Sequence, residues 1–196
     1  MSGAEALIYV LQTLGQLYIL IVLLRFVLQL VRADFYNPLS QFVVKATQPL
    51  LAPLRRVIPG FGGLDFAALM LAFLIHMALS LVILLLVGAP VVAMIPQVAI
   101  WVLISLSSLF LKIFFFALII SVILSWVAQG SRHPAVGLVH QICEPVLAPI
   151  RRLLPDLGGI DISPIFAFIA INLLDKMVIG NLAVQTGMLR IISPFM

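Results

Sequence analysis

Four long apolar runs constrain this chain more than any other feature of its sequence. They cover residues 7–31, 66–87, 98–126 and 162–184. A helix of about 20 residues crosses a hydrocarbon core of about 30 Å, so each run is long enough to span a membrane. The runs lack the alternation of apolar and polar residues that is typical of membrane β-strands. Because lipid offers no partner to unpaired backbone groups, we predict an all-α membrane protein with four transmembrane helices.

The composition agrees with this class. Of the 196 residues, 64% are hydrophobic and 9% are charged, whereas about a quarter of the residues of a soluble domain are charged. We expect the first run to remain in the protein rather than to be removed as a signal peptide. It follows Glu5 instead of a basic segment, and it exceeds the roughly 7–15 apolar residues of a signal peptide.

The chain repeats itself after 96 residues. The segment PLLAPLRRVIPGFGGLD at 49–65 returns without a gap as PVLAPIRRLLPDLGGID at 145–161. We therefore divide the chain into two units, 1–96 and 97–196, each built as span, linker and span. Each unit crosses the membrane twice, so both units enter it from the same side. The sequence thus predicts a tandem parallel repeat, unlike the inverted repeats of many transporters.

The two linkers, residues 32–65 and 128–161, have the pattern of amphipathic helices, which can lie in the membrane interface. Because Pro49 and Pro53 each remove a backbone donor, we expect the first linker to form a short helix, a break and a further turn. The expected apolar faces consist of Leu39, Phe42, Val43, Ala46, Leu50 and Leu54 in the first linker and Leu138, Val139, Ile142, Val146 and Ile150 in the second.

Positive charge is concentrated in the linkers. The segment at 88–97, which we interpret as a loop between the second and third runs, carries no charge. The positive-inside rule then places the linkers in the cytoplasm and both termini outside, in a bacterial cytoplasmic membrane. The cationic residues of the linkers are Arg32, Lys45, Arg55, Arg56, Arg132, Arg151 and Arg152.

Each linker ends in residues with distinct physical roles. A pair of arginines can bind the phosphates of anionic lipid headgroups, and the glycine pair that follows allows a sharp turn. Asp65 and Asp161 are predicted to cap the next span and to compensate the arginine charge. The predicted residues for binding a lipid or a partner are therefore Arg55, Arg56, Arg151, Arg152, Asp65 and Asp161.

These residues resemble the YggT family of small bacterial membrane proteins, which is related to the YlmG proteins of Gram-positive bacteria, cyanobacteria and plastids. The similarity rests on Ser125-Trp126 and on EPVLAPIRRLLPDLGGIDISP at 144–164, and the repeat extends it over nearly the whole chain. The resemblance implies a cytoplasmic-membrane location and roles in osmotic-stress tolerance and potassium balance. For the YlmG relatives it implies division or membrane organisation.

The first copy of the motif departs from this pattern. It has Gln48 where the second copy has Glu144, and Ala67-Ala68 where the second has Ser163-Pro164. If these positions matter chemically, the second copy is the better candidate for a functional site.

Polar side chains inside the spans are a further set of candidates, because such groups are costly in lipid. His76 lies near the middle of the second run, and its counterpart Asn172 lies near the middle of the fourth. Asp175 and Lys176 share a helix face with Asn172. His76, Asn172 and Asp175 fit a cation or proton path. The simpler interpretation is interhelical hydrogen bonding, with Lys176 snorkelling outward.

Two further cations lie within the runs. Arg25 is about 9 Å of helix from the cytoplasmic end of its run, at a rise of 1.5 Å per residue, and is expected to snorkel. The third run contains Lys112 and is too long for an upright crossing. It is either one tilted span or a span preceded by an interfacial segment around Trp101.

The sequence contains no known motif for nucleotide binding, acyl transfer or zinc hydrolysis. We therefore expect no catalytic residue, metal or cofactor, and a protein that is not an enzyme. Cys143 is the single cysteine, so no intramolecular disulfide can form. The net charge of +4 is explained by linkers that face anionic lipid, without nucleic acid as a partner.

Two function classes fit these observations. In the first, the protein serves membrane or osmotic homeostasis, and its arginine linkers bind anionic lipid headgroups or a cytoplasmic or membrane protein partner. In the alternative, it is a component of an ion transporter or channel, with potassium as a candidate ion. A homo-oligomer fits the alternative, because four spans leave little room for a pore in one chain. The repeated signature lies in the linkers, which favours the first class.

Overall fold

The computed structural model describes residues 3–60, 63–128, 130–131, 133–155, 161–189 and 191–192. Four helical segments in this part are long and apolar enough to span a membrane, so the predicted all-α fold with four spans is confirmed. The fourth span is continuous through three elements, of which the middle one, η1, is a π-helix. The elements are α1 (Gly3–Leu30), α2 (Pro38–Val57), α3 (Phe66–Leu86), α4 (Val91–Val127), α5 (Pro134–Leu153), α6 (Ser163–Leu173), η1 (Leu174–Ile179) and α7 (Gly180–Gln185).

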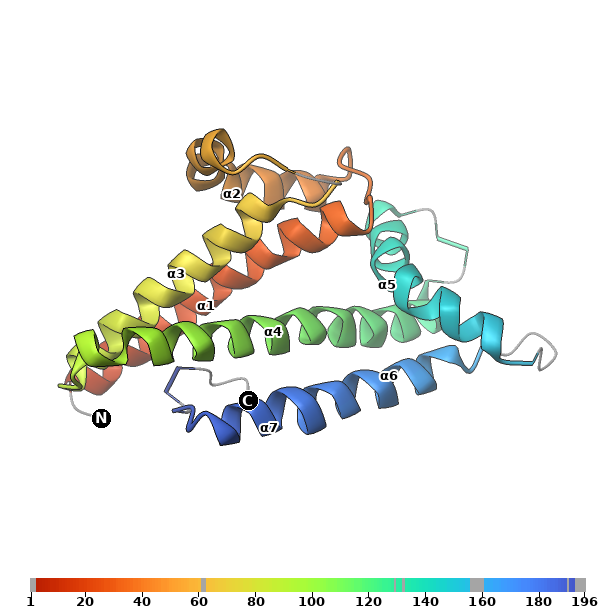
Figure 1. Ribbon diagram of the computed structural model, residues 1–196. Helices are drawn as coiled ribbons and strands as arrows, with labels where there is room; N and C mark the ends of the chain where they lie inside the picture. Colours follow the sequence, from red (N-terminus) through yellow and green to blue (C-terminus); the bar gives the residue numbers. More distant parts are fainter. Residues whose placement is uncertain are drawn as a thin grey trace.

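The spans form two antiparallel pairs. α1 packs against α3, and α4 packs against α6, η1 and α7 (Figure 1). α5 runs from the end of α1 to the start of α6, so that the two pairs and α5 outline a triangle. α2 and α5 lie at one end of the spans, and the start of α1 and the end of α7 lie at the other. A parallel repeat requires both linker helices to lie at the same end of the spans, as they do here. That both units enter a membrane from the same side stays a prediction.

Small residues bring α1 and α3 close together. Ala67, Ala68 and Ala72 of α3 are fully buried. A β-carbon added to Gly15 of α1 would lie 2.6 Å from a terminal carbon of Leu79, so a larger residue would require the Leu79 side chain to move. Close van der Waals contact of this kind holds helices together in lipid, where burial of apolar groups offers little gain.

Each linker forms one continuous helix, so the predicted break is wrong. α2 and α5 both contain 20 residues. Pro49 and Pro53 lie on the exposed side of α2, whereas Thr47 and Leu51 are fully buried on the opposite side. The carbonyl groups that lose their helical partners therefore face outward, where polar surroundings can satisfy them. For this reason the prolines do not end the helix.

The buried face of α2 also differs from the predicted one. It consists of Ser40, Val43, Thr47 and Leu51. Leu39, Phe42 and Leu50, which we expected on that face, are about half exposed or more. α2 therefore has a buried face, a polar face and an exposed apolar face between them, which lipid can cover. In α5, the predicted Leu138 and Ile142 are buried.

The third run is a single helix, α4, of 37 residues. The segment at 88–97 is therefore not a loop, because α4 already begins at Val91. Trp101 is 3% exposed, so it packs inside the protein, while its depth in a membrane stays a prediction. Its Nε1 and the Nε2 of Gln97 donate to the carbonyl of Thr186 at 3.0 and 2.7 Å. The last carbonyl groups of a helix have no hydrogen-bond partner within the helix. The two bonds supply such a partner to Thr186 at the end of α7.

Candidate functional site

In the first unit, an ion pair joins the last turn of α2 to the start of α3. Arg55 Nη2 donates to Asp65 Oδ2, and Asp65 Oδ1 accepts the amide of Ala68 at 3.2 Å. Gly63 turns the chain between them with a φ of +83°, which favours glycine. Asp65 is 2% exposed, so this carboxylate caps α3 inside the protein. The other glycines of the predicted turns lie outside the described residues: Gly62, Gly158 and Gly159.

The second unit forms the corresponding pair on its surface. Arg151 Nε donates to Asp161 Oδ2 at 2.8 Å, and its Nη1 donates to Glu144 Oε2 at 3.0 Å. Asp161 Oδ1 accepts the amide of Ser163 at 2.9 Å, in the first turn of α6. The side chains of Arg151 and Asp161 are 41% and 45% exposed. A similar linkage therefore occurs in both units, with a buried aspartate in the first and an exposed one in the second. Asp65 is the N-cap of α3, as predicted, whereas the N-cap of α6 is Ile162, so the same prediction for Asp161 is wrong by one residue.

Hydrogen bonding shifts the pKa values of the exposed pair in opposite directions. Burial by itself raises the pKa of Asp161, but hydrogen bonds from Ser163 and Arg151 outweigh it and hold that pKa below its ordinary value. Burial likewise lowers the pKa of Arg151, but the carboxylates of Asp161 and Glu144 outweigh it and raise that pKa. Each group therefore stabilises the charged form of the other.

The second arginine of each pair has different surroundings. Arg56 and Arg152 are exposed, and neither joins an ion pair within the described part of the chain. One arginine in each unit thus fastens the linker to the next span, and the other presents its charge to the surroundings. Two further cations of the sequence, Arg132 and Arg190, lie outside the described residues.

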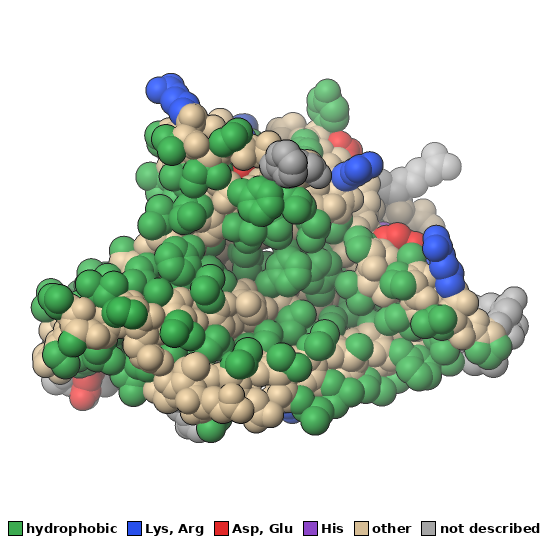
Figure 2. Space-filling model, in the orientation of Figure 1, with side chains coloured by type: hydrophobic (Ala, Val, Ile, Leu, Met, Phe, Trp, Pro, Cys, Tyr) green, Lys and Arg blue, Asp and Glu red, His purple; other side chains and the backbone are tan. Residues whose placement is uncertain are grey.

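The two linkers contact each other where their helices begin. Asn37 Nδ2 donates to the carbonyl of Pro134 at 2.7 Å, and the amide of Asp34 donates to Gln141 Oε1 at 3.0 Å. The linkers therefore form one continuous surface. Figure 2 shows that most Lys and Arg side chains on this face gather over α2 and α5, while hydrophobic side chains cover the spans.

The structure gives the polar residues of the spans separate surroundings. His76 of α3 is buried, with Nε2 3.3 Å from the carbonyl of Ile192. Asn172 Nδ2 donates to the carbonyl of Phe168 in its own helix at 2.9 Å. Lys176 is exposed, and its snorkelling stays a prediction. The hydrogen bonds of His76 and Asn172 therefore lead to different parts of the molecule.

Asp175 bonds to the neighbouring span. Its Oδ1 accepts a hydrogen bond from Ser108 Oγ of α4 at 2.7 Å, and its charge also acts on Lys112. This is an interhelical bond of the kind expected from the sequence. Ser108 was not among the predicted residues, because a serine inside an apolar run carries no signal of its own partner. Asp175 lies in η1, and π-helical segments are often found at functional positions.

Cys143 lies on the buried face of α5. Burial raises the pKa of its thiol to about 11, so the thiol is protonated at neutral pH and is a weak nucleophile. Within the described part of the chain, no group of three His, Cys, Asp or Glu side chains could hold a metal ion.

The four spans and the two linker helices at one end define a multi-pass α-helical membrane protein. Comparison with known proteins then identifies the family. The chain belongs to the CCB3/YggT family, whose profile matches residues 4–86 and again residues 100–182. The two matches begin 96 residues apart, which is also the spacing of the sequence repeat. The resemblance found in the sequence is thereby confirmed.

Several relatives cover nearly the whole chain, and a chloroplastic homolog covers a part of it. A protein of Pseudomonas aeruginosa named as uncharacterized is 65% identical over 191 residues, which are 97% of this chain and 97% of the relative. The uncharacterized protein YggT of Escherichia coli K12 is 39% identical over 94% of this chain and 95% of its own. A chloroplastic YlmG homolog of Arabidopsis thaliana is 38% identical over 64 residues, which are 32% of this chain and 25% of the homolog. No solved structure matches the chain.

Proposed function

We propose that this protein is a non-catalytic component of the bacterial cytoplasmic membrane, in which the arginines at the ends of its linkers bind anionic lipid headgroups. The role that fits this binding is membrane or osmotic homeostasis. One observation carries the proposal. In each unit the first arginine is held by an aspartate, and the second, Arg56 or Arg152, is exposed without an ion pair in the described part of the chain.

The surroundings of these two arginines favour a lipid surface. Val57 follows Arg56 and is 79% exposed, and Leu153 follows Arg152 and is 85% exposed. An apolar side chain next to a cation at the end of a linker helix fits the boundary between acyl chains and phosphates, because each group then meets its preferred surroundings. The positive-inside rule places this end on the cytoplasmic side, where the membrane surface is negative.

Ion transport has less support. A path for a cation needs polar groups that face a common space. His76 and Asp175, however, bond to the C-terminal segment and to α4, respectively. Asn172 bonds within its own helix.

The proposal is tested by lipid selectivity in reconstituted vesicles. Electron paramagnetic resonance of spin-labelled lipids measures how much phosphatidylglycerol, relative to phosphatidylcholine, is immobilised by the protein. The double variant Arg56→Gln, Arg152→Gln should lose most of the preference for phosphatidylglycerol. Each charge contributes about 1 kcal/mol near an anionic surface, which is roughly fivefold in selectivity. Raised salt should weaken the wild-type preference in the same way.

Lys176→Gln removes one exposed cation within the fourth span and is the control, since this residue lies away from the linkers. It should leave the preference for phosphatidylglycerol nearly unchanged. If the double variant keeps the wild-type preference, the exposed arginines do not bind lipid and the proposal is wrong. The role in osmotic homeostasis is tested by growth under osmotic challenge. A deletion strain is complemented with each variant at matched protein abundance.

A further inference from the structure

Arg25 of α1 is a buried cation, and two of its guanidinium nitrogens lack hydrogen-bond partners. It is 6% exposed, so it does not snorkel as the sequence led us to expect. Its Nε and Nη1 are buried, and neither has a hydrogen-bond partner among the described residues. The charge of Asp65 attracts Arg25 and that of Arg55 repels it, but a buried cation with unsatisfied hydrogen-bond donors is still costly. A ligand that offers anionic acceptor atoms would relieve this cost.

Arg25 lines a cavity of about 420 Å³ at the linker end of the first unit. Among the residues that line it, Arg25 and Asp65 are buried, whereas Phe35 and Gly60 are exposed. The third ionised group of the lining is Arg55, which is paired with Asp65. Two arginines and one aspartate leave a net charge of +1, which one phosphodiester group would neutralise.

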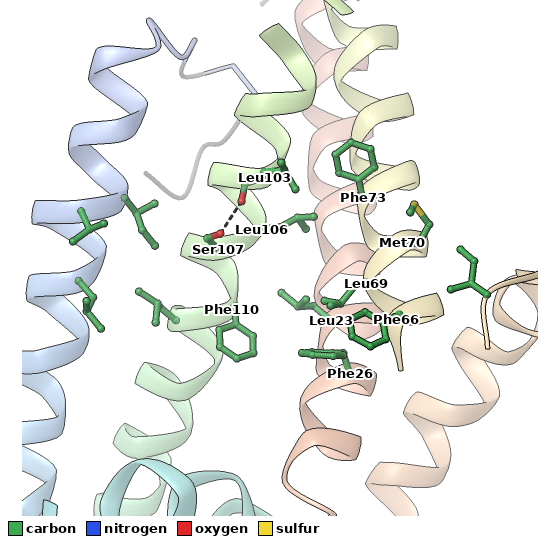
Figure 3. A pocket seen from close by; sticks show the side chains of 15 residues that line it. Leu23, Phe26, Phe66, Leu69, Met70, Phe73, Leu103, Leu106, Ser107 and Phe110 are labelled. Carbon is green, nitrogen blue, oxygen red and sulfur yellow. Dashed lines mark hydrogen bonds between the residues drawn. The ribbon is translucent and has the colours of Figure 1, made fainter. Parts of the chain in front are cut away.

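A larger apolar cleft of about 800 Å³ lies between the α1–α3 pair and the α4–η1 pair (Figure 3). The polar side chain of its lining, Ser107, donates its hydroxyl to the carbonyl of Leu103 at 2.9 Å, so its polarity is satisfied. Phe66 and Met70 of the lining are 40% and 41% exposed. The cleft therefore opens on the side of the spans, where a membrane supplies acyl chains.

The two cavities are built on the same helices. Phe26 and Phe66 line the apolar cleft and directly follow Arg25 and Asp65, which line the cationic cavity. An apolar cleft and a cavity of net charge +1, lined by neighbouring residues of the same helices, match the two parts of an anionic phospholipid. We propose that the first unit binds one such lipid, with its phosphate at Arg25 and Arg55 and an acyl chain in the cleft.

The second unit lacks this site. Ser121 stands 96 residues after Arg25, and Ser125 stands at the same distance from Gln29. The proposed lipid site is thus a feature of the first unit and not of the second, although the motif of the first unit departs more from the family pattern. The inference deepens the proposed function by assigning one lipid to one site. The inference rests on Arg25, whereas the proposed function rests on Arg56 and Arg152. Either of the two proposals can therefore fail while the other holds.

Native mass spectrometry of the full-length protein, released from detergent micelles, counts the lipids that stay bound. With phosphatidylglycerol added, we expect one lipid per chain to be retained at the lowest concentrations. Arg25→Gln should weaken this retention about tenfold or more, because hydrogen bonds to a charged partner are lost. Arg25→Lys should restore part of it, and the double variant Arg56→Gln, Arg152→Gln should keep it.

Competing ligands separate a lipid from a free phosphate. Inorganic phosphate and glycerophosphoglycerol, the headgroup without acyl chains, should displace the lipid poorly. If either competes as well as phosphatidylglycerol, the apolar cleft has no part in binding and the proposal is wrong. Retention of the lipid by Arg25→Gln at wild-type level would also overturn it, as would loss of the retained lipid in the exposed-arginine variant alone.

A variant in the cleft tests the site even if Arg25→Gln fails to fold. Ser107 is exposed, so Ser107→Phe can fill cleft volume without replacing a buried side chain. It should reduce lipid retention severalfold, while Ser107→Ala, the matched control, should retain the lipid like the wild type. Unchanged retention in Ser107→Phe would overturn the proposal. A second result would also overturn it: the wild-type spectrum shows a dimer, Ser107→Phe abolishes the dimer, and lipid retention stays constant. A second copy of the chain would then occupy the cleft.

Discussion

Arg151 Nε lies 2.8 Å from Asp161 Oδ2 and thereby fastens the end of α5 to the start of the fourth span. The pair of Arg55 and Asp65 fastens α2 to the second span in the same way. Both aspartates also accept a backbone amide in the first turn of the helix that follows. The position of each linker relative to its second span is therefore set within one unit, by contacts between residues close in sequence.

The two aspartates should differ in their effect on stability, although they are equivalent in the repeat. Asp65 is 2% exposed, and Asp65→Asn leaves Arg55 without its countercharge near the buried Arg25. We expect this variant to lose about 2–3 kcal/mol, as for a hydrogen bond to a charged group. Asp161→Asn should lose about 1 kcal/mol or less, because its pair is exposed. Thermal unfolding in detergent, followed by circular dichroism, measures both, and equal losses would contradict the prediction.

Asp161 should make the stability depend on pH in the acidic range. Burial raises its pKa, but hydrogen bonds from Ser163 and Arg151 outweigh it, so the pKa of the folded state lies below the ordinary value of 3.8. Such a group stabilises the fold above its unfolded pKa, and this contribution is lost as the pH falls through the folded value. Between neutral pH and about pH 3, the unfolding temperature of Asp161→Asn should therefore fall less than that of the wild type. Parallel pH profiles would show that the pair does not contribute.

The bond between Ser108 and Asp175 should stabilise the packing of α4 against the fourth span. Ser108→Ala removes this bond, and interhelical hydrogen bonds in membranes contribute about 0.6 kcal/mol, up to about 1.7 kcal/mol. Ser107→Ala is the matched control, because the Ser107 hydroxyl bonds to its own helix. We expect a lower unfolding temperature for Ser108→Ala and almost no change for Ser107→Ala. Indistinguishable variants would mean that the bond adds nothing.

Cysteine labelling should place the linkers in the cytoplasm. Tyr36, in the first linker, is 89% exposed, and Val92, at the start of α4, is 83% exposed; the two lie at opposite ends of the spans. A membrane-impermeant maleimide should label Val92→Cys in intact spheroplasts and Tyr36→Cys in inverted vesicles. The native Cys143 is buried, and its thiol pKa is about 11, so the wild type provides a low background. Labelling of both positions from one side would contradict the topology.

The four spans could be predicted from the sequence, and the repeat can be seen in it, because both are patterns in the sequence itself. A run of about 20 apolar residues is recognisable without any partner, and the repeat of Arg55 and Asp65 at Arg151 and Asp161 is visible in the letters alone. The linker helices were also recognisable from their pattern. Their prolines suggested a break because propensity is local, whereas the position of Pro49 on an outward face depends on the packing of α2.

Only the tertiary structure decided which polar groups lie inside the protein. Arg25 was expected to reach water, yet it is 6% exposed, and the indole of Trp101 is likewise buried inside the protein. Ser108 gained its role from Asp175, 67 residues away. In a membrane, the packed face and the lipid-facing face of a helix are both apolar, so hydropathy does not show which face turns inward. Which face turns inward depends on the neighbouring helix. The position of the candidate lipid site therefore also depends on how the helices pack.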